Sequence, residues 1–263
     1  MVSDSMPVAT ETTGENSSNN FSRGWKEPTK FHFAIVLVVL VIAAAVVFLV
    51  VRKNNTSQAY SQIRASGIPS YISTPLANLM ELSPSPSNAT APNFTLTDQN
   101  GKTYSLSSFR GKSVVLEFMD PNCTDICPLV SQEFVNAYHD LGASANNVVF
   151  IAVNVNKYHL STAAVTRFTN EHNLNQIPNW HFFTGQLNTL KSVWHNYGIT
   201  VDAPSPTADV IHTSVVFFIG PNGHERYIAT PTDYHTKSGA AYLPASQLTS
   251  WGKGIALISH NLT

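Results

Sequence analysis

The longest uninterrupted apolar stretch of the chain covers residues 31–51, which hold no charged side chain and one histidine near the start. At 1.5 Å per residue, a helix of this length spans about 31 Å, close to the thickness of the hydrocarbon core of a bilayer. We therefore predict one transmembrane helix, an anchor, over 31–51. A buried soluble helix and a cleaved signal peptide are the alternatives, but the apolar run continues past the small residues at 43–45.

Polar segments lie on both sides of the predicted anchor. Residues 1–30 lack hydrophobic periodicity, which predicts a disordered polar tail. Residues 52–92 end in Pro- and Ser-rich sequence, which predicts an extended linker. The positive charges before and after the anchor are nearly balanced, so we choose the simpler orientation, with the short tail inside. This predicts a single-pass protein of the plasma membrane with its domain on the extracytoplasmic face.

The remaining residues, 93–263, alternate between strand-like and helix-like patterns. Continuous apolar runs bounded by turn residues predict buried strands, and apolar positions at helical spacing predict helices. In chain order we predict a hairpin over 94–106, a strand over 114–119, a helix over 128–141, a strand over 148–155, a helix over 161–172, a strand over 180–183, a helix over 186–197, strands over 215–219 and 225–228, and a helix over 245–260. This order predicts an α/β sandwich with a mixed central sheet.

Composition narrows the classes of function. The formal net charge is −1 and only 12% of the residues are charged, so we expect no nucleic acid partner bound through a broad basic surface. Two cysteines cannot build a disulfide framework or a four-cysteine zinc site. Ten histidines leave mixed sulfur and imidazole chemistry open.

Both cysteines lie in one short segment, Cys123-Thr124-Asp125-Ile126-Cys127-Pro128, between a predicted strand and a predicted helix. Their spacing lets the two sulfurs converge on one point. Pro128 fits a first helical turn, which places Cys127 near a helix amino end, where the thiolate is favoured. A disulfide across so short a loop stabilises the fold by only about 2 kcal/mol, so we interpret the cysteines as a redox or metal-binding pair. A structural disulfide and two inert buried thiols are the alternatives.

A third metal ligand is expected from elsewhere in the chain, because two thiolates alone make a weak site for a divalent metal. His212 stands out among the histidines, since it follows a proline-containing loop at 202–209 and precedes the predicted strand at 215–219. Two sulfurs and one imidazole suit copper in both oxidation states. The alternative for His212 is an ordinary loop histidine.

These motifs resemble the Sco (SenC) family. The resemblance rests on the Cys-x-x-x-Cys-Pro motif at 123–128, the His-Thr-Ser sequence at 212–214 and the Gly-Pro-Asn-Gly turn at 220–223, and it covers roughly residues 92–260. It implies a membrane-anchored, thioredoxin-like protein that helps to assemble the copper site of cytochrome c oxidase subunit two. It also implies that Cys123, Cys127 and His212 bind a copper ion. The family usually has an acidic residue directly before the histidine, whereas this chain has Ile211.

Several functions are compatible with these residues. We favour a copper-binding assembly factor, a metallochaperone whose client is a cuproprotein such as cytochrome c oxidase subunit two. The first alternative is a thiol–disulfide reductase that keeps the cysteines of a cuproprotein reduced and does not require His212. The second is a peroxidase of the peroxiredoxin type, although Asp120 stands where the proline of that signature belongs. A structural or adhesive domain without a metal is the remaining alternative.

Overall fold

The computed structural model describes residues 39–53, 67–86 and 88–263, and the chain divides into two units, Met1–Ser57 and Gln58–Thr263. In the first unit, residues 39–53 form a helix with exposed side chains. Within the described ranges, no helix combines the length and the apolar character needed to cross a bilayer. The predicted tail at 1–30 and the first part of the predicted anchor, 31–38, lie outside the described residues.

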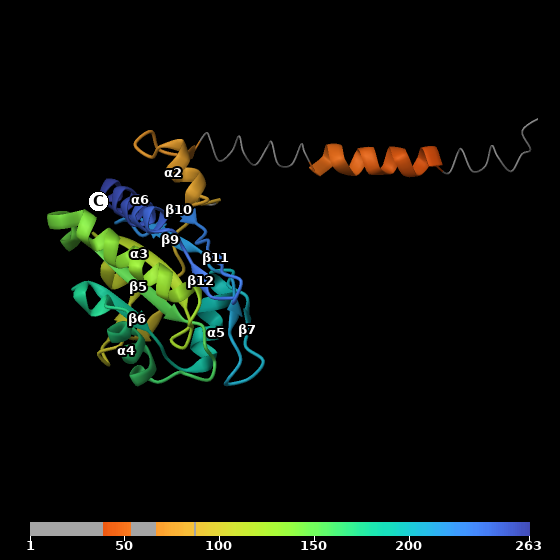
Figure 1. The fold of residues 1–263 in the computed structure, drawn as a ribbon. Helices are drawn as coiled ribbons and strands as arrows, with labels where there is room; N and C mark the ends of the chain where they lie inside the picture. The colour runs from red at the N-terminus through yellow and green to blue at the C-terminus, as the bar shows by residue number, and fades with distance from the viewer. Residues whose placement is uncertain (1–38, 54–66, 87) are drawn as a thin grey trace, which may run out of the picture. The chain divides into compact units, whose positions relative to one another are not determined.

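A six-stranded mixed sheet forms the centre of the second unit, in the order β1-β10-β9-β4-β5-β6 (Figure 1). Strands β4, β5 and β6 run parallel, while β9, β10 and β1 are added antiparallel. Every residue of β4 and β5 is buried, which explains why their sequences are nearly continuous apolar runs. The strands are β1 (Ser83–Pro84), β4 (Ser113–Met119), β5 (Val148–Asn154), β6 (Trp180–Phe183), β9 (Val216–Ile219) and β10 (Glu225–Ala229).

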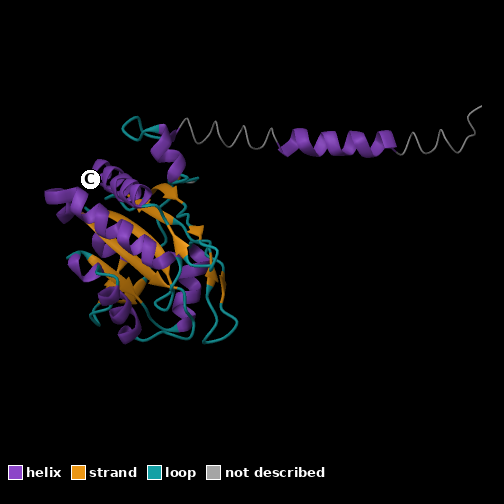
Figure 2. Ribbon diagram, in the orientation of Figure 1, coloured by secondary structure: helices purple, strands orange, loops and turns teal. Residues whose placement is uncertain are grey.

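Helices pack on both faces of this sheet (Figure 2). On one face, α3 (Ile126–Leu141) lies against α6 (Ala245–Leu262), with α4 (Thr162–Glu171) beside them. On the other face, α5 (Leu187–Asn196) and the hairpin of β2 (Thr95–Thr97) and β3 (Thr103–Ser105) cover a second apolar core. This architecture confirms the predicted α/β sandwich with a mixed sheet. Three short 3-10 helices complete this part of the chain: η1 (Leu106–Phe109), η2 (Gly142–Asn147) and η3 (Leu174–Gln176).

The segment predicted as a linker, 52–92, is not an extended spacer over its described part. It contains the helix α2 (Thr74–Leu79) and the edge strand β1, and Met80 and Leu82 are fully buried in the core. The linker prediction was wrong here because it weighed the prolines and serines and neglected the apolar residues between them. A proline is compatible with a strand at the edge of a sheet.

At both edges of the sheet, a residue hinders the addition of a further strand. On one side, β1 places Pro84, which has no backbone N–H, opposite Tyr227 of β10. On the other side, the amide side chain of Gln99 bonds to β6: its Nε2 donates to the carbonyl of Trp180 at 3.0 Å, and its Oε1 accepts from the backbone N–H of Phe182 at 2.7 Å. Gln99 therefore occupies hydrogen-bonding positions that a further strand would use.

Two small sheets were not predicted. One is the pair β7 (Val201–Asp202) and β8 (Ile211–His212), and the other is the hairpin of β11 (Tyr234–His235) and β12 (Ala241–Tyr242). Each strand has two residues, too few to show an alternating pattern in the sequence. Both sheets contribute residues to the region around the cysteines.

Candidate metal centre

The cysteine loop connects the end of β4 to the start of α3. Cys123 is half-buried and Cys127, in the first turn of α3, is 2% exposed. The backbone N–H of Cys127 donates to Cys123 Sγ at 3.4 Å, and the backbone N–H of Cys123 donates to the carbonyl of Asp120 at 3.1 Å. The structure therefore brings the two cysteines together, as predicted, and both are unbridged thiols.

The two thiols differ in acidity. A hydrogen bond from the Cys127 thiol, opposed by burial and helped by backbone N–H groups, lowers the pKa of Cys123 to about 7. The same hydrogen bond, together with burial, raises the pKa of Cys127. We expected the helix terminus to favour a thiolate at Cys127, and that expectation was wrong. Cys127 donates both its thiol and its backbone N–H to Cys123, so the negative charge is favoured on Cys123.

Asp120 connects the cysteine loop to the loop that follows β5. Its carboxylate is 4% exposed and accepts hydrogen bonds from the backbone N–H of Asn122 at 2.8 Å and from Asn156 Nδ2 at 2.9 Å. Asn156 Oδ1 in turn accepts from the backbone N–H of Tyr158 at 2.9 Å. These bonds fix the start of the cysteine loop against the neighbouring parallel strand.

His212 lies on β8, outside the central sheet. Its Nδ1 faces the carbonyl of Thr213 at 3.0 Å, which assigns the ring proton to Nδ1 and leaves the lone pair on Nε2. Burial lowers the pKa of His212, although the Thr213 carbonyl and the Asp120 carboxylate act in the opposite direction. A neutral imidazole with a free Nε2 lone pair has the protonation state that a metal ligand requires.

The three predicted ligands are not gathered into one compact group. Within the described part of the chain, Cys123, Cys127 and His212 do not form a set whose ligand atoms all lie within 4.8 Å of one another. They share one neighbour, because the charge of Asp120 acts on both thiols and on the imidazole. The donor types fit a soft ion, but the structure differs from the prediction because the three ligand atoms do not all lie within 4.8 Å of one another.

A different group of side chains does meet within 4.8 Å: Asp125, Asp233 and His235. His235 Nε2 lies 3.3 Å from Asp125 Oδ2 and 3.7 Å from Asp233 Oδ2. Because Asp125 lies between the two cysteines, these contacts join the β11–β12 hairpin to the cysteine loop. No pattern in the sequence indicates this contact, because the two residues are 110 positions apart in the chain.

Two buried acids were not predicted as part of the site region. Glu117 on β4 and Glu133 on α3 are each 1% exposed. Burial raises the pKa of Glu117 to about 8, and burial together with the charge of Glu117 raises the pKa of Glu133. Glu117 Oε1 accepts a hydrogen bond from Ser214 Oγ at 3.0 Å. The signal in the sequence was visible, because Glu117 is the one charged residue inside the apolar run at 114–119.

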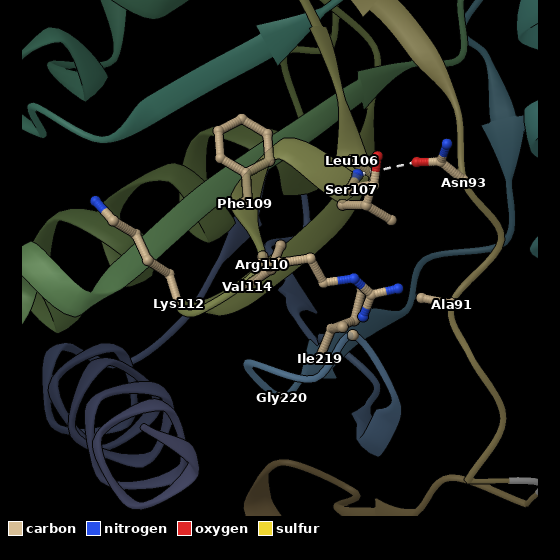
Figure 3. Close-up of a pocket in the computed structure, with 11 residues that line it drawn as sticks. Ala91, Asn93, Leu106, Ser107, Phe109, Arg110, Lys112, Val114, Ile219 and Gly220 are labelled. Carbon is tan, nitrogen blue, oxygen red and sulfur yellow. Dashed lines mark hydrogen bonds between the residues drawn. The ribbon is translucent and has the colours of Figure 1, made fainter.

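A cleft of about 390 Å³ opens beside Cys123. Its wall includes Pro128, Phe168 and Arg167, and the Arg167 guanidinium donates to the carbonyl of Pro121 at 3.1 Å and to the side chain of Asn122. A second, much smaller pocket of about 10 Å³ lies at the opposite end of β4, near Arg110 and Val114 (Figure 3). The cleft at Cys123 is therefore the one of these two that gives access to a thiol.

A mixed-sheet α/β sandwich with two adjacent thiols between a buried strand and a helix defines a thioredoxin-like dithiol protein. The chain belongs to the SCO1/SenC family, whose sequence profile matches residues 83–242. Over 132 residues it is 28% identical to the SCO1 protein homolog of Bacillus subtilis (strain 168), covering 49% of this chain and 68% of that protein.

Two other similarities differ in extent. The crystal structure of Arabidopsis thaliana ScoI with copper bound has a TM-score of 0.50 and 20% sequence identity, covering 65% of this chain and 98% of that chain, which shows the fold alone. The chloroplastic peroxiredoxin Q of Triticum aestivum is 43% identical over 61 residues, which are 23% of this chain and 28% of that protein. The peroxiredoxin similarity is therefore local, whereas the Sco similarity extends over most of the second unit.

Proposed function

We propose that the protein binds one copper ion through Cys123, Cys127 and His212 and assists the assembly of a copper site in a client such as cytochrome c oxidase subunit two. The observation that carries the proposal is the pair of adjacent thiols at the end of β4, with the charge favoured on the more accessible Cys123. Two sulfurs and a neutral imidazole are donors that suit copper. Family membership and the copper-bound ScoI neighbour support the same choice of metal.

The chain's own residues prepare this site in three ways. Cys127 donates to Cys123 and so favours a thiolate there. The carbonyl of Thr213 holds the ring proton of His212 on Nδ1, which leaves Nε2 for the metal. Asp120 supplies one negative charge near all three side chains. The copper ion, when bound, is the cargo, and it can pass to a client protein by exchange of ligands.

Anaerobic titration of the reduced full chain with copper tests this function. We expect one copper per chain, with loss of binding in Cys123→Ala and Cys127→Ala and weaker binding in His212→Ala. His195→Ala, a change on the last turn of α5, is the matched control and should bind like the wild type. Wild-type affinity and absorption spectrum in His212→Ala would exclude the third ligand and reduce the proposal to a dithiol site.

A thiol–disulfide reductase is the second candidate, and the different acidities of the two thiols favour it. A reactive Cys123 beside an open cleft and a buried Cys127 fit an attacking and a resolving thiol. Cys127→Ser should then accumulate a mixed disulfide on Cys123 with a disulfide-bonded client peptide. Absence of that adduct, with copper binding intact in the wild type, would favour the metallochaperone alone. Peroxide consumption by the reduced protein tests the peroxidase alternative in parallel.

We propose further that residues 31–51 anchor the protein in the plasma membrane with the second unit on the extracytoplasmic face. The uncharged sequence of 31–51 supports this proposal. The full chain should resist extraction by alkaline carbonate, and protease added to spheroplasts should remove the second unit. Release of the full chain by carbonate, or protection from the protease, would contradict the anchor or its orientation.

A further inference from the structure

The segment that carries His212 bridges two sheets. His212 pairs with Val201 in the small β7–β8 sheet, whereas β9 of the central sheet begins only at Val216. On the side of the small sheet, Thr213 is held by Thr200: its N–H donates to the Thr200 carbonyl at 3.1 Å, and the two hydroxyls are 2.8 Å apart. The position of His212 relative to the central sheet therefore depends on what holds residues 214 and 215.

Glu117 provides a connection to the central sheet at this point. The pairing of β4 with β9 ends at Leu116 and Phe217. In the next position on β4, the Glu117 carboxyl accepts the hydroxyl of Ser214 at 3.0 Å, and the backbone amide of Val215 also interacts with it. A carboxyl that is 1% exposed is costly to bury, so this contact is a specific feature of the fold.

We propose that Glu117 is a positioning residue for His212, because its buried carboxyl ties the histidine segment to the strand that carries the cysteine loop. The inference rests on the proposed copper function and adds to it a residue that does not touch the metal. Strand β4 ends at Met119 and leads directly into the loop that contains Cys123. One strand therefore sets the positions of both parts of the site, the thiols through the chain itself and the imidazole through Glu117 and Ser214.

Glu133 provides a matched control. It is also 1% exposed, and its Oε2, like Glu117 Oε2, has no hydrogen-bond partner among the described residues. It interacts with Glu117 electrostatically, but no hydrogen bond from Glu133 to residues 212–215 is found in the described part of the chain. A change at Glu133 therefore disturbs a buried acid at the same depth without removing the contact to Ser214.

The test compares copper binding by the reduced full chain and four variants. Glu117→Leu removes the acceptor, Ser214→Ala removes the donor, Glu117→Gln keeps an acceptor oxygen, and Glu133→Leu is the control. The readouts are the copper dissociation constant and the nitrogen hyperfine splitting in the electron spin resonance spectrum of the Cu(II) form. We expect Glu117→Leu and Ser214→Ala to weaken binding about tenfold, in the range that loss of a buried hydrogen bond gives, and to reduce the nitrogen splitting. Glu117→Gln and Glu133→Leu should stay close to the wild type.

Several results would overturn the inference. One is wild-type copper affinity and nitrogen splitting in both single variants, Ser214→Ala and Glu117→Leu. If Glu117→Leu does not fold, the same result in Ser214→Ala alone would overturn the inference. Another is an equal loss of binding in Glu117→Leu and Glu133→Leu without rescue by glutamine, which would indicate general damage to the core.

Failure of the copper proposal would look different, because the wild type would then bind no copper, or His212→Ala would bind it like the wild type. The ring resonances of His212 in the metal-free protein still test the positioning role in that case. They should move in Ser214→Ala and not in Glu133→Leu, and unchanged ring resonances in Ser214→Ala would overturn it.

Discussion

Replacement of the buried Glu117 by glutamine should change how the stability of the protein depends on pH. Burial raises the pKa of this carboxyl from 4.5 to about 8, although Ser214 and two backbone amides favour the charged form. Between these two pH values, the folded protein keeps a proton that the unfolded chain has lost, so the free energy of unfolding falls as the pH rises. One pH unit corresponds to about 1.4 kcal/mol for a single group. Between pH 5 and pH 7, Glu117 should therefore lower the stability by about 3 kcal/mol.

Urea denaturation of the reduced, metal-free protein at pH 5, 6 and 7 measures this effect. Glutamine has no proton to lose in this range and keeps the oxygen that accepts from Ser214. In Glu117→Gln, the free energy of unfolding should therefore fall by about 3 kcal/mol less between pH 5 and pH 7 than it does in the wild type. The slope of stability against urea concentration should not change, because the exposed surface is the same.

Glu133 also contributes to the pH dependence of stability. Burial and the charge of Glu117 raise its pKa as well, so Glu117→Gln should keep a smaller dependence in the same direction, and the double variant with Glu133→Gln should lose still more of the fall in stability. An unchanged pH dependence in Glu117→Gln would contradict this prediction, because it would mean that the folded protein does not hold the proton on Glu117.

Three further predictions concern other parts of the molecule. Alkylation of Cys123 by iodoacetamide should follow a titration with a midpoint near pH 7, because the Cys127 thiol donates to it. In Cys127→Ala, which removes this donor, the midpoint should rise, and an identical midpoint would contradict the role of the thiol. The imidazole of His212 should titrate below 6.5 in proton resonance spectra of the metal-free protein, because burial lowers its pKa; a midpoint above 6.5 would contradict that cause. Gly252→Ala should lower the urea midpoint by an amount equivalent to about 1–3 kcal/mol, because the added Cβ would lie 2.5 Å from Asn136 Cβ where α6 meets α3.

Most long elements of the second unit could be predicted from the sequence, because each has many positions that repeat one pattern. The strand predicted over 180–183 is β6, and the helix predicted over 245–260 is most of α6. The two-residue strands β7, β8, β11 and β12 carry no such pattern, and their positions depend on tertiary contacts such as the one between His235 and Asp125. Such short segments cannot be predicted from sequence periodicity.

The candidate site was predictable in its residue types and less so in its geometry. The motif at 123–128 identified the two thiols, and they do lie together. The charge was assigned to Cys127 from its place at a helix end, but hydrogen bonds from Cys127 favour it on Cys123. The position of His212 in the chain made it a candidate ligand. Its distance from the two sulfur atoms depends on tertiary structure and could not be predicted from the sequence. Glu117 interrupts the apolar run at 114–119, but the sequence alone does not show which residue it contacts.

The two closed edges of the central sheet have a consequence for how copies of this protein meet. An open edge strand offers a row of free amides and carbonyls to which another chain can add, and such addition leads to aggregation. Pro84 has no N–H to offer at one border, and Gln99 already occupies two of the backbone groups at the other. Crowded molecules of this protein are therefore shielded from joining into a continuous intermolecular β-structure.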